Sequence, residues 1–167
     1  MFKKKLEFTF LFVILLSISL LVFNFYTSYT FKNNDISENF KQRIKIKEKE
    51  VLQYMKQNFG VTYKFPIIVT DKFKGKLYGL TSYKEGKIKI YLNKNVMQES
   101  MDYMVQSVIA HEYAHALLFK LKHFDSKVDG HSQEWKETCE KLGGVDCQQY
   151  VDRHEIIMSK MPFSSTF

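Results

Sequence analysis

An H-E-x-x-H run at residues 111–115 has the residue types and the spacing that metal-dependent hydrolysis requires. Residues four apart on an α-helix lie on one face, so His111 and His115 can bind the same ion. Glu112, one position further round the helix from His111, can take a proton from a metal-bound water instead of ligating the metal. Zinc lowers the pKa of such a water towards neutrality and polarises a scissile carbonyl. The motif therefore predicts a zinc site that hydrolyses peptide bonds without a covalent intermediate.

The flanking residues predict the helix that carries this motif. Positions 101–110 contain neither glycine nor proline, and their apolar residues recur at helical spacing. Ser100 can cap the start, and Glu99 adds negative charge near the positive end of the helix dipole. Because apolar residues continue as far as Leu121, we expect one helix to extend beyond the motif in both directions.

A catalytic zinc needs a third protein ligand and keeps its fourth position for water. A metzincin would place glycine three residues and histidine six residues after the second histidine, but Leu118 and Leu121 stand there, which excludes that class. A thermolysin-like gluzincin would use a later glutamate, and Glu134 is at a suitable separation. His131, in the run D-G-H-S-Q-E-W, is the other candidate. The residue types alone leave both candidates open.

The H-E-x-x-H-A run and the later D-G-H-x-x-E-W run together resemble the SprT-like metallopeptidase domain, which is related to the YgjP/WLM-type zincins. The resemblance extends over residues 36–145. It implies that His131 is the third zinc ligand, beside His111 and His115, with Zn²⁺ as the cofactor and Glu112 as the catalytic residue. It also implies that Trp135, one helical turn after His131, packs beneath the site.

Two cysteines, Cys139 and Cys147, are too few for the four-ligand zinc ribbon that many SprT-like proteins carry C-terminally. Cys139 falls on the Trp135 face of its predicted helix, and Cys147 follows a Gly-Gly break. A disulfide between them is feasible if the domain lies outside the cell, where oxidation is permitted. A packed Cys139 and a free Cys147 is the alternative, and the sequence does not decide between the two.

Two other histidines are interpreted as having no part in the zinc site. His123 ends the catalytic helix, where a cation suits the helix dipole, so we interpret it as a capping residue. His154 falls in a late polar helix predicted near Gln148–Lys160, and we interpret it as a surface residue, with a transition-state donor at the zinc site as the alternative.

The N-terminus carries a long uncharged segment between Phe8 and Phe31, which follows three lysines and a glutamate. A helix of this length can span a bilayer. A signal peptide has an apolar core of about 7–15 residues and a small-x-small cleavage site, whereas residues 24–29 are bulky and aromatic. We therefore predict a short basic tail over residues 1–7 and an uncleaved transmembrane anchor over residues 8–31, with a removed signal peptide as the alternative.

The basic residues around this segment predict its orientation. The lysines of the tail favour a cytoplasmic N-terminus and an extracytoplasmic catalytic domain. Most of the basic residues after the segment alternate with acidic ones on a predicted amphipathic helix, and only Lys32 lies at the flank. We expect a single-pass membrane protein with its N-terminus inside.

The charge of the chain argues against nucleic acid as a partner. The formal net charge is +7, of which the first 34 residues hold +3. The rest of the chain holds 21 basic and 17 acidic side chains, which are spread along it. This is a mildly basic surface without the clustered Lys and Arg of a nucleic-acid-binding stripe. We expect a protein or peptide substrate and a membrane contact through the N-terminal helix. The sequence predicts no oligomeric state.

Residues 35–167 are enough for one compact metallopeptidase domain, for which we expect an α+β zincin-like fold with a small sheet. Apolar residues spaced along one face predict a helix that ends at Gly60. Residues 61–70 predict a strand in which Pro66 requires an edge position or a bend. Residues 77–83 and Lys87–Leu92 predict a hairpin across residues 84–86. The catalytic helix and a helix supplying the third ligand follow.

In such folds the strand before the catalytic helix often accepts substrate as an added strand, because main-chain hydrogen bonds recognise an extended peptide. We expect the Lys87–Leu92 strand, or its edge neighbour, to align substrate, and pairing within the sheet alone is the alternative.

The predicted zinc site and the N-terminal segment are compatible with three functions. A membrane-anchored protease of envelope or extracellular proteins is favoured. A cytoplasm-facing protease of DNA-associated proteins and a non-catalytic zinc-stabilised binding module are the alternatives.

Overall fold

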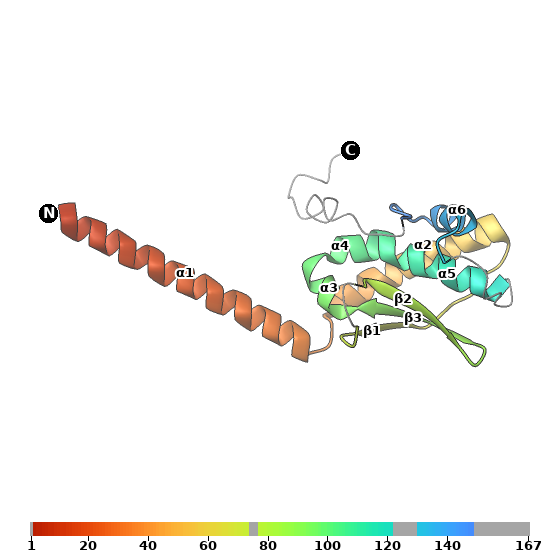
Figure 1. Ribbon diagram of the computed structural model, residues 1–167, viewed down its shortest axis with the longest axis horizontal. Helices are drawn as coiled ribbons and strands as arrows, with labels where there is room; N and C mark the ends of the chain where they lie inside the picture. The colour runs from red at the N-terminus through yellow and green to blue at the C-terminus, as the bar shows by residue number, and fades with distance from the viewer. Residues whose placement is uncertain (1, 74–76, 122–129, 149–167) are drawn as a thin grey trace. The chain divides into compact units, whose positions relative to one another are not determined.

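The computed structural model describes residues 2–73, 77–121 and 130–148 (Figure 1). The chain divides into two compact units, Met1–Ile36 and Ser37–Phe167. His123, His154 and all but the first residue of the helix predicted near Gln148–Lys160 lie outside the described residues.

The first unit is a single helix, α1 (Phe2–Asn33), whose side chains are exposed along most of its length. Its span Lys3–Asn33 has a mean hydropathy of 2.5 over its most apolar part. At about 1.5 Å per residue, such a helix is longer than the roughly 30 Å hydrocarbon core of a bilayer. By length and composition it is long and apolar enough to cross a membrane.

The second unit begins with α2 (Glu38–Phe59), which ends as predicted. The Ser37 side chain accepts a hydrogen bond from the Phe40 N–H at the start, and Gly60 closes the helix in the left-handed conformation that glycine adopts without strain. Ile44, Val51 and Met55 form its buried apolar stripe. The same face also buries a lysine and a glutamate, which the apolar pattern did not predict.

Three strands follow: β1 (Ile67–Thr70), β2 (Gly79–Lys84) and β3 (Lys87–Asn93). The predicted hairpin is confirmed, because β2 pairs antiparallel with β3 across Glu85 and Gly86. Both turn residues have positive φ, 52° and 76°, as in the hairpin turns whose twist matches that of the strands.

The predicted strand over residues 61–70 is wrong for its first six residues, because β1 begins only after Pro66. Proline has no N–H to give to a ladder, so regular pairing starts beyond it. The Pro66 carbonyl accepts a hydrogen bond from the Ile90 N–H at 2.9 Å. β1 lies at an edge of the sheet, as the proline required.

β3 is the central strand, since the order of the sheet is β1–β3–β2 with β1 parallel to β3. The prediction that Lys87–Leu92 itself receives a substrate strand is therefore wrong: both of its edges are already paired within the sheet. Its edge neighbour β2 has one edge that no described strand pairs. Ile88, Ile90 and Leu92 are buried, as their alternation with Lys89 and Tyr91 predicted.

A short helix, α3 (Lys94–Glu99), precedes the run that carries the H-E-x-x-H motif, which consists of α4 (Met101–Tyr103), a π-helical segment η1 (Met104–Val108) and α5 (Ile109–Leu121). The run spans the predicted residues, but the π segment was not predicted. Ser100 is the N-cap residue of α4, as predicted, but its hydroxyl makes no capping bond and donates instead to the Val96 carbonyl at 3.4 Å.

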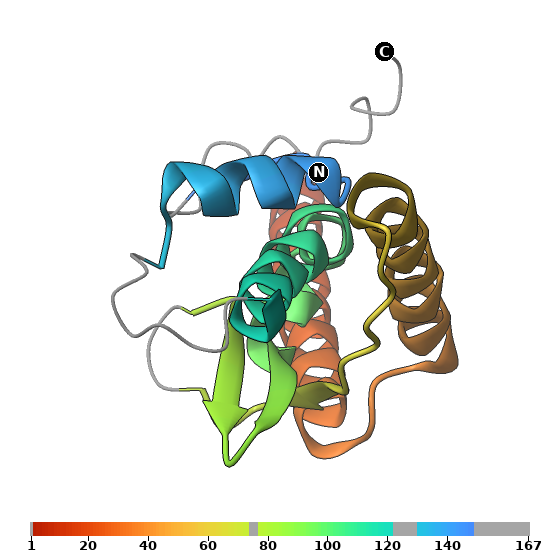
Figure 2. The same ribbon diagram turned by 90° about the vertical axis from the view of Figure 1, so that its right-hand side faces the viewer.

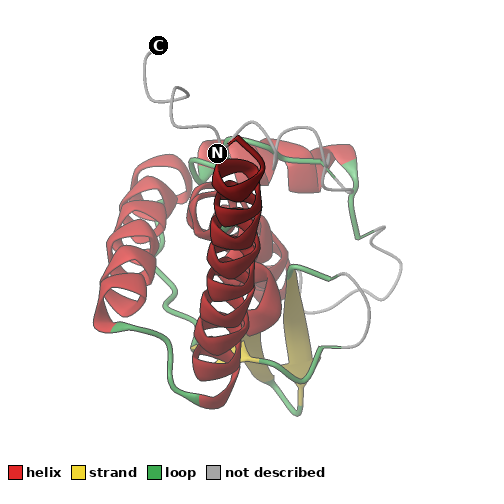
Figure 3. Ribbon diagram, turned by 90° about the vertical axis from the view of Figure 1, so that its left-hand side faces the viewer, coloured by secondary structure: helices red, strands yellow, loops and turns green. Residues whose placement is uncertain are grey.

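Helix α5 lies at the centre of the second unit, where it contacts β2 and β3 on one side and α2 and α6 (Gln133–Lys141) on the other (Figure 2). Its buried residues form the core between these layers, together with the inner face of the sheet. Strands make up a small part of the unit (Figure 3). The expected α+β architecture with a small sheet, preceded by one apolar helix, is thus confirmed.

Candidate metal centre

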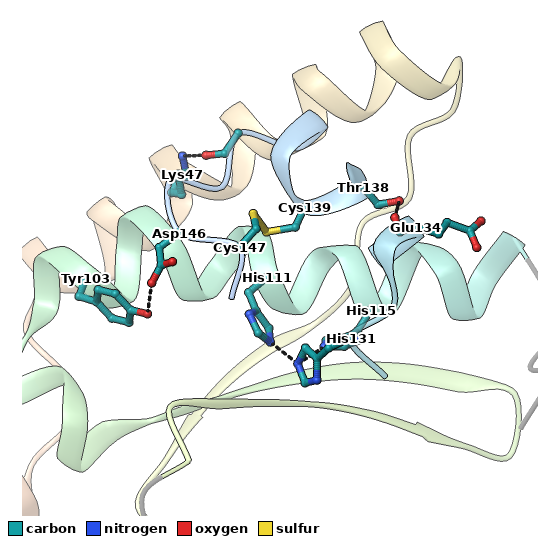
Figure 4. Close-up of a disulfide and its surroundings, with 11 residues drawn as sticks. Lys47, Tyr103, His111, His115, His131, Glu134, Thr138, Cys139, Asp146 and Cys147 are labelled. Carbon is teal, nitrogen blue, oxygen red and sulfur yellow. Dashed lines mark hydrogen bonds between the residues drawn. A yellow bond between two sulfur atoms is a disulfide. The ribbon is translucent and has the colours of Figure 1, made fainter. Parts of the chain in front are cut away.

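Three histidine side chains converge where α5 meets the start of α6. Helical spacing places His111 and His115 on one face of α5, with ring centroids 5.1 Å apart. His131 approaches from the segment before α6, and its Nε2 lies 3.2 Å from His111 Nε2 and 3.3 Å from His115 Nε2 (Figure 4). The candidate ligand atoms of the three rings all lie within 4.8 Å of one another.

Local sequence fixes the position of His131. Ser132 is the N-cap of α6, and its hydroxyl accepts a hydrogen bond from the Trp135 N–H at 3.3 Å. This cap sets the start of the helix at Gln133, two residues after the histidine. The cap therefore fixes where α6 begins, and His131 lies just before that point, in contact with the histidines of α5.

Trp135 lies against all three histidine rings. It is 2 % exposed, with ring centroids 4.5 Å from His111, 5.2 Å from His115 and 4.6 Å from His131. A large buried aromatic side chain in contact with each ring restricts the rotamers that the rings can adopt. The packing predicted for Trp135 is confirmed by these contacts.

The chemistry of the three nitrogens fits a shared cation. His131 Nε2 can carry at most one proton, so it cannot donate a full hydrogen bond to both of its neighbours. At a Zn–N distance of about 2.0–2.1 Å, tetrahedral ligand atoms lie about 3.3 Å apart. His131 Nε2 lies at 3.2 Å and 3.3 Å from the Nε2 atoms of His111 and His115, which agrees with this spacing. A divalent metal would satisfy all three lone pairs at once.

The histidines of α5 are also in the protonation state that a metal requires. Burial, and then repulsion from His131, lowers the pKa of His111 to about 4. Burial, followed by repulsion from His111 and His131, lowers the pKa of His115 to about 3. Both rings are therefore neutral at pH 7, as metal ligands must be.

Glu134, the rival third ligand, is not part of the cluster. Its side chain is exposed on α6 and points away from the histidines (Figure 4). The reason is helical phase: buried Trp135 faces α5, so the preceding residue is turned towards solvent.

Glu112 lies beneath β2 and is 5 % exposed. The Thr81 hydroxyl is 2.7 Å from Glu112 Oε2 and 2.8 Å from the Glu112 main-chain oxygen. Burial raises the pKa of Glu112 to about 7, and the hydrogen bonds from Thr81 oppose this rise. A cation bound nearby would lower it again.

Thr81 and its neighbour Gly79 were missed by the sequence reasoning. A Cβ atom built on Gly79 would lie 2.6 Å from Glu112 Oε1, so the strand approaches the carboxylate more closely than any other residue type would allow. The one available signal was a glycine in a predicted strand, which often indicates such an approach. The hydroxyl of Thr81 gave no signal, because nothing in the spacing links β2 to α5.

Cys139 and Cys147 form a disulfide, which decides the alternative that the sequence left open (Figure 4). The bond joins α6 to the segment that follows it. Lys47 Nζ donates to the Gly143 carbonyl at 3.0 Å, and the Tyr103 hydroxyl donates to Asp146 at 3.0 Å. The helix that bears Trp135 is thus tied to α2 and α4 at its far end.

The fold and the cluster define a mixed α+β domain with a three-histidine group that could bind metal. Residues 33–156 match the SprT-like family, and the chain belongs to this family. Protein SprT of Vibrio atlanticus is 30% identical over 105 residues, which cover 63% of this chain and 60% of that protein. The chain thus spans less than two thirds of that relative. No solved structure shows a significant match.

Proposed function

We propose that this protein is a membrane-anchored, zinc-dependent endopeptidase that hydrolyses peptide bonds of envelope or extracellular proteins. The observation that carries the proposal is the three-histidine cluster beside Glu112 in a member of the SprT-like family. His111, His115 and His131 would hold the metal. When bound, zinc supplies a Lewis acid that activates water and polarises the scissile carbonyl.

Glu112 is the residue to which we assign proton transfer. As a general base it removes a proton from the attacking water, and as a general acid it returns that proton to the leaving nitrogen. Burial keeps its carboxyl group dry and raises its pKa, which makes the carboxylate a better base towards water, whereas a cation bound nearby opposes this rise. A purely structural metal site has no use for such a group, which argues against a non-catalytic binding module.

The edge of β2 that no described strand pairs is our candidate for substrate alignment. The Ile90 N–H points to β1, and Thr81 is the partner of Ile90 in β2. In an antiparallel ladder, the main-chain N–H and C=O groups of two opposite residues either point towards each other or both point away. The groups of Ile90 point away from β2, so those of Thr81 point away from β3, to the open edge. An extended peptide can add there through main-chain hydrogen bonds, with little dependence on its sequence.

Two features favour the extracytoplasmic location over the cytoplasmic one. The three lysines before the apolar segment of α1 favour a cytoplasmic N-terminus, which would place the domain outside. The Cys139–Cys147 disulfide belongs in an oxidising compartment, because cytoplasmic thiols are kept reduced. The alternative is a cytoplasm-facing protease of DNA-associated proteins. The disulfide argues against the cytoplasm, and the lack of clustered Lys and Arg argues against contact with DNA.

Removal of the metal should abolish proteolysis reversibly. We expect the full-length protein in detergent to cleave fluorescein-labelled casein, to lose activity after dialysis against 1,10-phenanthroline, and to regain it on addition of one equivalent of Zn²⁺. Turnover and bound zinc are measured on the same samples. Full activity in protein shown to be free of metal would exclude the proposal.

Topology is tested separately with a tag placed after Phe167. Treatment of intact cells or spheroplasts with an impermeant protease should remove the tag, while a cytoplasmic marker stays protected. The two cysteines should resist a maleimide reagent until a reductant is added. A tag that is lost only after lysis would place the domain in the cytoplasm and move DNA-associated proteins to first place among the substrates.

A further inference from the structure

Glu112 is held by the sheet as well as by its own helix. Helix α5 lies against β2 (Figure 2). The contact at this point is polar: one Thr81 hydroxyl reaches both the carboxylate and the main-chain oxygen of Glu112, at 2.7 Å and 2.8 Å. Among the described residues, Thr81 is the one whose side chain hydrogen-bonds to that carboxylate.

The Thr81 hydroxyl bridges two oxygens of one residue. It lies within hydrogen-bond distance of Glu112 Oε2 and of the Glu112 main-chain oxygen. The hydroxyl belongs to β2 and the main-chain oxygen belongs to α5, so this contact fixes the carboxylate relative to both elements.

Gly79 makes a second, independent contact with the same group. A Cβ atom at this position would lie 2.6 Å from Oε1 and 2.8 Å from Cγ of Glu112. The positive-φ residues of the described chain do not include Gly79, so its backbone conformation does not require glycine. The close approach of the Glu112 side chain does require it.

We propose that Thr81 and Gly79 form a positioning element that fixes the Glu112 carboxylate from the edge strand. This inference rests on the proposed function, because it assigns the two residues a task in proton transfer. It also joins two parts of the site: the strand whose open edge is our candidate for substrate alignment is the strand that holds the base. Strand β2 would therefore hold both the substrate and the base, and so fix the position of one relative to the other.

Thr81→Val, Thr81→Ser and Gly79→Ala in the full-length protein test this proposal, with casein as substrate. We expect kcat to fall roughly tenfold to a hundredfold for Thr81→Val, since misplacement of a catalytic group by about 1 Å costs that much. KM, bound zinc and the melting temperature should change little. Thr81→Ser keeps the hydroxyl and should restore most of kcat.

Gly79→Ala should give a similar loss of kcat. The added methyl group would overlap Oε1, Cγ and Cδ of the buried Glu112 side chain, so this side chain must shift and the carboxylate is displaced. The melting temperature, measured on the same sample, separates this displacement from a loss of the fold. Thr70→Val is the matched control: it makes the same chemical change as Thr81→Val at the end of β1, the opposite edge strand, where the hydroxyl accepts a hydrogen bond from the Lys72 N–H at 3.2 Å, and it should leave kcat unchanged.

The proposal is overturned if Thr81→Val keeps kcat within twofold of the parent protein, if Thr81→Ser loses as much as Thr81→Val, or if the variants act by losing zinc. Glu112→Gln, measured beside them, separates this failure from that of the proposed function. An inactive Glu112→Gln with an active Thr81→Val removes only the positioning role. An active Glu112→Gln removes the base itself.

Discussion

Glu112→Gln is expected to reduce kcat by about 10²–10⁴-fold, the usual contribution of a general acid–base residue. Glutamine has nearly the same shape, and its amide oxygen can still accept the Thr81 hydrogen bond. An amide cannot take a proton from water near neutral pH, so the attack step loses its base. The three histidines are untouched, and bound zinc should remain at one equivalent.

The measurement is turnover of casein together with zinc content and melting temperature on the same preparation. Glu137→Gln is the control, because it makes the same chemical change at an exposed position of α6, where the carboxylate accepts a hydrogen bond from Gln133. It should leave all three quantities unchanged. Full activity of Glu112→Gln would contradict the assignment of the base and with it the proposed mechanism.

The second large effect concerns the third ligand. His131→Ala should release zinc, whereas Glu134→Ala should keep it. Removal of His131 leaves two nitrogens where a catalytic zinc needs three protein ligands. We expect the affinity to fall by more than the roughly 10–100-fold that follows when a ligand merely loses its hydrogen-bond partner. Glu134 is exposed and lies outside the cluster, so removal of its carboxylate should not change the affinity for zinc.

Competition with a chromophoric chelator measures both affinities on the full-length protein, and turnover of casein should follow the zinc content. Circular dichroism checks that His131→Ala remains folded, which we expect because Trp135 and the disulfide still hold α6. Release of zinc from Glu134→Ala and retention by His131→Ala would move the chain to a gluzincin-like arrangement.

Sequence patterns were sufficient wherever the physics is local. The end of α2 at Gly60, the turn at Glu85 and Gly86, and the pairing of His111 with His115 all depend on residues within one or two turns of each other. Helical and strand periodicity therefore predicted these features correctly. The apolar character of α1 is also a property of its composition alone.

Patterns failed where a distant contact decides the outcome. Lys47 and Glu48 are buried on α2 because each has a hydrogen-bond partner on a distant element. Lys47 donates to the Gly143 carbonyl, and Glu48 accepts a hydrogen bond from the Tyr113 hydroxyl at 2.9 Å. Nothing in the helical spacing of α2 reveals these partners. The central position of β3 likewise follows from the parallel pairing of β1, which depends on the path of the chain and not on the residues of β3.

The sequence by itself determined the chemistry that is available: two histidines on one helical face, a glutamate between them, two later candidates for the third ligand, and an apolar N-terminal helix. Only the tertiary structure decided which groups meet. It turned His131 towards α5 and Glu134 towards solvent, and it laid Thr81 and Gly79 against Glu112. The reason is physical: periodicity fixes the face on which a side chain lies, but the packing of whole elements fixes what that face meets.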